Sequence, residues 1–100
     1  GLIRLVTKDN EIGYGISGDH RQCRLWIVQP YLKLPATWGN GTLVALNAPT
    51  RAVVDEFYNA ALEHGGYDEG APGLRPFNAN FYASYVRDPD GNKLSSVCES

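Results

Sequence analysis

The sequence contains no methionine and only two cysteines among its 100 residues. Because a native start would carry a methionine, we expect Gly1 to follow an opening segment that this chain does not include. Two cysteines are too few for a disulfide framework, and a zinc site needs more ligands at closer spacing. Cys23 and Cys98 are therefore expected to be reduced, buried thiols of a cytoplasmic protein.

The sequence also lacks a basic cluster and a long hydrophobic run. Nine Lys and Arg residues against eleven Asp and Glu residues give a net charge of −2. Nucleic acid is not the expected partner, because phosphate groups are bound by clustered Lys and Arg. A membrane is not expected either, since no apolar stretch approaches the roughly 20 residues that a spanning helix needs. The 43% of hydrophobic residues suffices for one small domain.

The second half of the chain predicts one helix among several strands. Thr50 is a good N-cap residue, and Gly65-Gly66 supplies the left-handed position that ends a helix. The turn Asp88-Pro89-Asp90-Gly91 suits a tight reversal between two strands, with Asp88 and Asp90 accepting local hydrogen bonds. The expected strands span residues 42–47, 67–70, 81–87 and 92–98, and residues 71–76 are expected to form a loop.

The first half predicts strands over residues 2–6, 12–17 and 23–29. Gly13 and Gly15 indicate a bend or a close backbone approach in the second strand. The apolar run CRLWIVQ predicts that the third strand is buried on both of its faces. Residues 30–40 contain two prolines and predict a loop whose apolar side chains lie against another part of the protein. Short strands with a single helix indicate an α+β fold.

The segments GTLVALNAPTRAVVDEFYNAALEHGG, APGLRP and FYASYVRDPDGNKL together resemble the second module of the vicinal oxygen chelate superfamily. This is the glyoxalase, bleomycin-resistance and extradiol-dioxygenase group, and the similarity is greatest to small bacterial glyoxalase-like proteins. It covers nearly the whole chain and is best from Gly41 to Val97. The resemblance implies paired βαβββ modules that form a curved mixed sheet around a cup.

The same resemblance implies how this chain is divided. The whole chain is one glyoxalase-like domain, in which residues 1–29 are a partial first module without its first strand and helix. Residues 30–40 are a linker, and residues 41–100 are a complete second module. Members of the family pair their modules within a chain or between chains, and we expect a homodimer.

Enzymatic members hold a divalent metal in the cup with His, Gln or Glu, and the resemblance places three of the four positions in this chain. The strand 23–29 has no Asp, Glu or His, and Trp26 or a neighbour takes the inward place. Leu43 stands where the family often has His, and Ser95 stands where it has Glu. Leucine has no lone pair, and a neutral hydroxyl is a poor ligand. No metal and no other cofactor is therefore expected here. His20, in a polar turn, and His64, at the helix end, are expected to be structural.

Three functions fit these features. The first is a metal-independent module that binds a small organic molecule, with Arg75 as the anchor for an anionic group. Its expected pocket residues are Trp26, Leu43, Arg75, Phe77, Tyr82, Tyr85 and Ser95. For Arg75 a surface salt bridge or a loop brace stays an open alternative, and aromatic side chains on strands pack in the core more often than they line a pocket. The second function is a metal-dependent lyase or dioxygenase relative whose ligands come from the missing segment or a partner chain. The third is a structural or interaction domain whose cup is filled by its own side chains.

Overall fold

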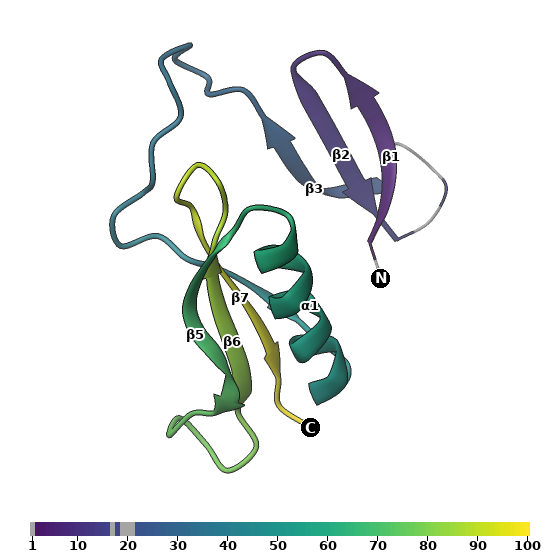
Figure 1. Cartoon of the computed structure of the whole chain (residues 1–100). Coiled ribbons are helices and arrows are strands. Elements are labelled where there is room, and N and C mark those ends of the chain that lie inside the picture. The colour runs from purple at the N-terminus through teal and green to yellow at the C-terminus, as the bar shows by residue number, and fades with distance from the viewer. Residues whose placement is uncertain (1, 17, 19–21) are drawn as a thin grey trace. The chain divides into compact units, whose positions relative to one another are not determined.

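The computed structural model describes residues 2–16, 18 and 22–100, so that His20 lies outside the described residues. The chain divides into two compact units, Gly1–Ala36 and Thr37–Ser100 (Figure 1). No helix in the described part of the chain is long and apolar enough to cross a membrane.

The first unit is an antiparallel sheet of strands β1 (Ile3–Lys8), β2 (Glu11–Gly15) and β3 (Cys23–Val28), in the order β1-β2-β3. The close backbone approach expected at the β2 glycines is confirmed. A Cβ atom at Gly13 would lie 2.8 Å from the ring of Trp26. A Cβ atom at Gly15 would lie 2.7 Å from the carbonyl oxygen of Gln22. A larger residue would therefore displace the Trp26 ring at Gly13 and the backbone just before β3 at Gly15.

The expectation that β3 is covered on both faces is wrong. Trp26, Ile27 and Val28 are all exposed, with 43% of Trp26 accessible to solvent. In the described residues no helix belongs to the first unit, and α1 packs on the strands of the second unit. The loop side chains do not pack as expected either, since Tyr31 is 95% exposed. An apolar run specifies a strand, but what covers it depends on residues far away in the chain.

The second unit is a four-stranded sheet with one helix packed on one face (Figure 1). The strands are in the order β4-β7-β6-β5, where β4 is parallel to β7 and the other pairs are antiparallel. The elements are β4 (Val44–Asn47), α1 (Arg51–Glu63), β5 (Tyr67–Leu74), β6 (Tyr82–Arg87) and β7 (Lys93–Cys98). This arrangement confirms the α+β class.

The ends of α1 follow the expected capping. Thr50 has an extended backbone, and its Oγ1 accepts a hydrogen bond from the Val53 amide at 3.2 Å. At the other end Gly65 has a φ of 94°, and the ring Nδ1 of His64 lies 2.8 Å from the Ala60 carbonyl oxygen. His64 thus has the structural role expected of it. Val54, which is fully buried, anchors the helix to Cys98 in the core.

The loop expected over residues 71–76 is wrong in its first part, because β5 continues to Leu74. The pairing of β5 with β6 shifts register around Gly70 and again before Gly73, so the strand bends while it stays paired. Pro72 has no amide to donate, but β5 lies at the edge of the sheet, where only one side of the strand is paired. Local composition indicated a loop, whereas edge pairing maintains a strand.

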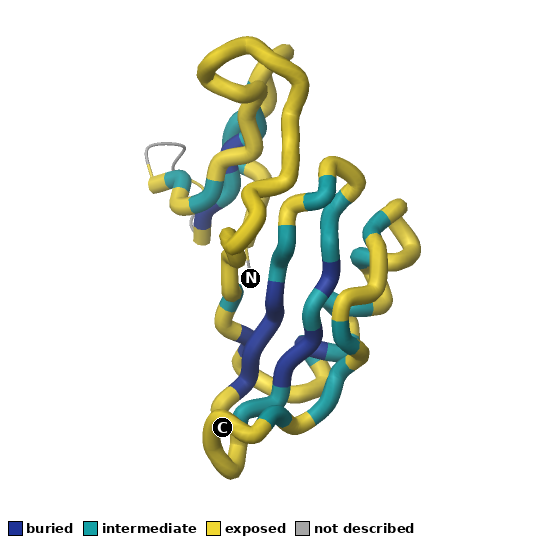
Figure 2. Tube along the Cα trace, turned by 90° about the vertical axis from the view of Figure 1, so that its left-hand side faces the viewer, coloured by how far each residue is buried: buried dark blue, intermediate teal, exposed yellow. Residues whose placement is uncertain are grey.

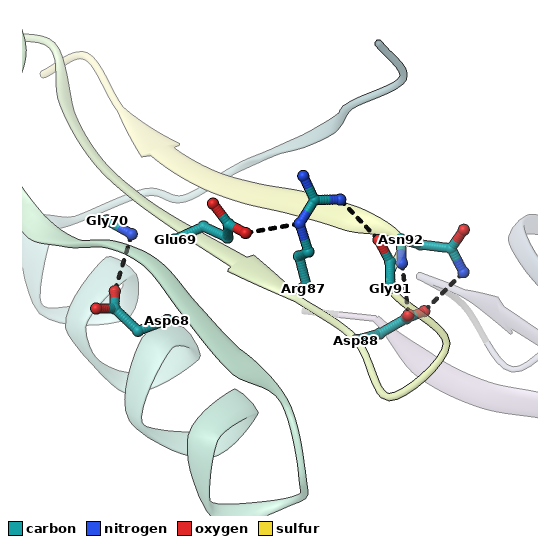
Figure 3. Close-up of polar contacts among 7 residues, drawn as sticks. All are labelled: Asp68, Glu69, Gly70, Arg87, Asp88, Gly91 and Asn92. Atoms are coloured by element: carbon teal, nitrogen blue, oxygen red, sulfur yellow. Dashed lines mark hydrogen bonds and ion pairs between the residues drawn. The ribbon is translucent and has the colours of Figure 1, made fainter. Parts of the chain in front are cut away.

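Asp88 organises the turn between β6 and β7 (Figure 3). Its Oδ1 accepts hydrogen bonds from the amides of Asp90 at 3.0 Å and Asn92 at 2.8 Å. Its Oδ2 accepts from the Asn92 side chain at 3.0 Å. Gly91 closes the turn with a φ of 90°, a value that glycine adopts without strain. In the second unit the buried residues concentrate on the two strands that this turn joins (Figure 2).

We predict that Asp88→Ala lowers the free energy of unfolding by about 1–2 kcal/mol, because it removes three hydrogen bonds to the turn. Asp90→Ala, a change of the same kind two residues away, should be close to neutral. Urea denaturation of both variants checks this. Equal losses would show that the Asp88 carboxylate does not hold the turn.

Candidate ligand-binding face

The four-stranded sheet presents two chemically different faces. On β6, Tyr82 and Val86 face α1, where Tyr82 packs on the core and donates a hydrogen bond to Asp55. Because side chains alternate along a strand, the residues between them point to the opposite face. We call this opposite side of the sheet the distal face. By register it includes Ala83, Tyr85 and Arg87 of β6 and Lys93, Ser95 and Val97 of β7.

Two cations lie against Tyr85 on the distal face. The Cζ atom of Arg75 is 5.5 Å from the centroid of the Tyr85 ring, and the Nζ atom of Lys93 is also 5.5 Å from it. Neither cation has a carboxylate partner in the described part of the chain. Contact with an aromatic ring is favourable by about 0.5–1 kcal/mol at exposed sites and leaves the positive charge in place. This part of the face therefore attracts anions.

Arg75 is also held by the backbone. Its Nη2 donates to the carbonyl oxygen of Ala71 at 2.7 Å, and Nη1 makes a longer contact of 3.4 Å with that of Leu74. A Cβ atom at Gly73 would lie 3.1 Å from Nη1, so the missing side chain makes room for the guanidinium. Arg75 therefore does brace its own loop, which was one of the roles expected for it. These two hydrogen bonds use only some of the five N–H donors of the guanidinium, so the others remain available to a ligand.

Ser95 lies directly opposite Tyr85 in the pairing of β6 with β7. Its side chain is 0% exposed, and its Oγ has no hydrogen-bond partner among the described residues. Ser84 is equally buried and equally without a partner, but it is two residues from Tyr82 and so faces the helix. A buried hydroxyl without a partner costs about 1–3 kcal/mol. Ser95 thus leaves hydrogen-bonding capacity unused beside the two cations.

The structure brings only some of the expected pocket residues together. Arg75 and Tyr85 are in contact, and Ser95 is paired with Tyr85 across the strands. Tyr82 is on the helix side, and Phe77 lies in the loop after β5, where its ring packs edge-on against Phe81 at 5.0 Å.

Trp26 is in the first unit, next to Gly13. Leu43 immediately precedes β4, is exposed, and lines a pocket together with Arg87 and Lys93 of the distal face.

Sequence reasoning missed two cations of the distal face, Arg87 and Lys93. Arg87 donates from Nε to Glu69 at 2.6 Å and from Nη1 to the Gly91 carbonyl oxygen at 2.8 Å (Figure 3). Its guanidinium also lies 5.0 Å from the ring of Trp38. The signal was present in FYASYVR, because Arg87 is two residues after Tyr85 and must share its face.

The donors on this face do not fit a divalent metal. No three His, Cys, Asp or Glu side chains gather anywhere in the part of the chain that the structure describes. Leu43 offers no lone pair, and Ser95 offers a neutral hydroxyl. Arg75 and Lys93 beside Tyr85 would repel a cation. The arrangement is suited to an anion instead.

Comparisons with known proteins agree with this fold. The family model described as Glyoxalase/Bleomycin resistance protein/Dioxygenase superfamily matches residues 4–95. The chain is similar to the crystal structure of a glyoxalase/bleomycin resistance protein from Albidiferax ferrireducens, with 30% identity and a TM-score of 0.79. That similarity covers 95% of this chain and 73% of the other. No curated protein sequence matches the chain significantly.

Two more distant structures share the fold. One is a glyoxalase-related enzyme from Fulvimarina pelagi, with 17% identity and a TM-score of 0.72 over 97% of this chain and 70% of the other. The other is a glyoxalase/bleomycin resistance protein/dioxygenase family enzyme from Burkholderia phytofirmans, with 17% identity and a TM-score of 0.67 over 100% of this chain and 80% of the other. At this identity the likeness concerns the fold alone.

On the helix side, the hydrogen bond from Tyr82 to Asp55 has a length of 2.7 Å. This bond to the carboxylate, followed by partial burial, raises the pKa of Tyr82 above its ordinary value of 10.0. The positive charges of Arg51, whose guanidinium is 5.2 Å from the ring, and of Arg75 act on this pKa in the opposite direction without cancelling the shift. The phenol therefore keeps its proton longer in the folded state than in the unfolded state.

We predict a loss of stability at alkaline pH that depends on Tyr82. The contribution of the Tyr82–Asp55 bond is fully present below about pH 10 and is lost as the pH rises through the higher pKa of the folded state, because the unfolded state loses its proton first. Urea unfolding between about pH 9 and pH 11 should show a shallower decline for Tyr82→Phe than for the unmodified chain. Tyr31→Phe, at an exposed position, should leave the decline unchanged. An unchanged decline in Tyr82→Phe would contradict the assignment.

Proposed function

Because the chain belongs to the glyoxalase/bleomycin resistance protein/dioxygenase superfamily, we propose that it binds a small organic anion on the distal face without using a metal ion. One observation carries this proposal: Arg75 and Lys93 both contact Tyr85 and have no carboxylate partner among the described residues. The charges on a binding face are normally balanced, and here an anionic ligand would balance them.

Each of the residues around Tyr85 has a distinct role in the proposal. The Arg75 guanidinium pairs with a carboxylate or phosphate through N–H groups that its bonds to Ala71 and Leu74 leave available. The Tyr85 ring forms a flat wall for the apolar part of the ligand. The Ser95 hydroxyl has no partner among the described residues but is 0% exposed, so it gives or accepts a further hydrogen bond only once the ligand displaces the side chains that cover it. Binding then depends on charge, shape and one hydroxyl.

The composition of the site favours binding over catalysis. Arg75, Tyr85, Lys93 and Ser95 include no carboxylate or imidazole, the side chains that serve most often as general bases, and no described residue is hydrogen-bonded to the Ser95 hydroxyl to activate it as a nucleophile. A lyase or dioxygenase activity in this protein would need ligands from residues outside the described chain.

We propose in addition that the protein is a cytoplasmic homodimer. Neither of its two cysteines forms a disulfide, as expected of a cytoplasmic protein, although Cys23 is only half-buried where a buried thiol was expected. Ile3, Ile27 and Val28 expose apolar side chains in the first unit, and a second chain would bury such a surface. Sedimentation equilibrium of the intact protein tests the proposed homodimer, and a monomer at micromolar concentration would contradict it.

We predict that a panel of small carboxylates and phosphate esters contains a ligand that raises the melting temperature of the protein at constant ionic strength. Arg75→Gln should weaken binding of that ligand at least about tenfold, since a hydrogen bond to a charged group contributes about 1.5–3 kcal/mol. Arg51→Gln is the matched control, because Arg51 lies over Tyr82 in the same way but on the helix side.

A second matched pair tests the hydroxyl. Ser95→Ala should weaken the same ligand, whereas Ser84→Ala, which removes the other buried hydroxyl without a partner, should not. If all four variants bind alike, or if no anion in the panel stabilises the protein, the distal face is not the binding site.

A further inference from the structure

We infer that the chain carries a second anion site, a phosphate-sized pocket between the segment Gly39–Leu43 and the two cations Arg87 and Lys93. The pocket has a volume of about 260 Å³ and is lined by Gly39, Asn40, Gly41, Thr42, Leu43, Arg87 and Lys93. Pockets for drug-sized ligands begin at roughly 300 Å³. The pocket therefore suits a small anion such as phosphate better than a drug-sized molecule. The inference does not rest on the function proposed above.

Arg87 is fixed in place before any ligand arrives. Its Nε donates to Glu69, its Nη1 donates to the carbonyl oxygen of Gly91, and Trp38 lies against its guanidinium. Nη2 has no partner among the described residues. An arginine held in one orientation loses little conformational entropy when it binds an anion through its free edge.

The charge in this pocket is positive. Glu69 balances Arg87 from outside the pocket lining, whereas Lys93 has no carboxylate partner in the described residues. None of the lining residues is acidic. An anion entering here would meet Arg87, whose charge Glu69 balances, and Lys93, whose charge no described carboxylate balances, with no carboxylate in the pocket lining itself.

The opposite wall is a glycine-rich turn. The Thr42 amide donates to the Gly39 carbonyl oxygen at 2.8 Å, and Gly41 has a φ of 94°, which closes the turn at its third residue. The amides of Asn40 and Gly41 have no acceptor in the described part of the chain, and neither has the Thr42 hydroxyl a partner there. Short side chains let an anion approach such backbone amides closely.

Trp38 joins the two walls. It precedes the turn at Gly39, lies against Arg87, and would be 3.2 Å from a Cβ atom at Gly91. A bound anion that draws Arg87 or the turn toward itself therefore changes the surroundings of the indole. The pocket thus contains its own fluorescent reporter.

The test is a fluorescence titration with inorganic phosphate, using chloride at equal ionic strength as the control. Trp26→Phe leaves Trp38 as the only tryptophan, since the sequence has two. We expect a saturable change. Lys93→Gln should weaken phosphate binding at least about tenfold and Thr42→Val about fivefold, because the first removes a charged and the second a neutral hydrogen bond. Lys33→Gln, the same change at an exposed loop position, should have no effect.

The pocket shares Lys93 with the site proposed around Tyr85, and Arg75→Gln separates the two. If phosphate binding survives Arg75→Gln and weakens in Thr42→Val, the pocket is confirmed whatever the panel of organic ligands shows. If Arg75→Gln abolishes binding and Thr42→Val leaves it intact, the anion lies beside Arg75 and Tyr85 and this inference is wrong. A change that does not saturate also overturns it. Calorimetric titration of the chain with both tryptophans repeats the measurement in case Trp26→Phe does not fold.

The same titration with glycerol phosphate distinguishes free phosphate from the phosphate group of a small metabolite as the natural ligand. Equal affinity for both compounds supports a pocket that takes the phosphate group alone. Tighter binding of the ester supports a pocket that takes the phosphate end of a small metabolite. If Lys93→Gln and Lys33→Gln bind phosphate equally well, and bind the ester equally well, the pocket binds neither free phosphate nor a phosphate ester and the inference is wrong.

Discussion

The antiparallel pairing of β6 with β7 decides which residues meet in the second unit. It sets Tyr85 opposite Ser95 and Tyr82 opposite Cys98, so that every second residue turns to the helix and the others to the distal face. A slip of one residue would exchange the two sets, because the side-chain period along a strand is two. Packing of α1 on Val86 and the gathering of cations around Tyr85 are therefore two consequences of one register.

That register depends on a short polar turn and on one arginine. Asp88 holds the amides of Asp90 and Asn92, which closes the turn and aligns the strands. Arg87 then connects this turn to the edge strand through Glu69. The cation thus supports the sheet and lines a pocket at the same time. Substitutions of Arg87 would mix effects on folding and binding, whereas Lys93 and Thr42 take part in no such brace.

Sequence reasoning succeeded where the chemistry is local. The Thr50 cap, the glycine stop and the Asp88 turn were predictable because each uses hydrogen bonds between near neighbours. It failed for β5 beyond Gly70 and for the cover of β3, because edge pairing and the cover of a sheet depend on distant residues. Of the candidate site residues, Arg75, Tyr85 and Ser95 lie together on the distal face, and their role in binding stays a prediction. Tyr82 was grouped with them, although the alternation of side chains along β6 places it on the helix side. Arg87 and Lys93 were overlooked because the same alternation was not used to assign them to the face of Tyr85.

The central claim is that this face binds anions in place of a metal. Its most direct test is the metal content of the intact protein, purified without chelator and then titrated with zinc, nickel and manganese. The account predicts no stoichiometric metal and no rise in melting temperature with any of the three, because Leu43 and Ser95 are poor ligands and Arg75 and Lys93 repel cations. One metal ion per chain, bound with a clear rise in stability, would contradict it.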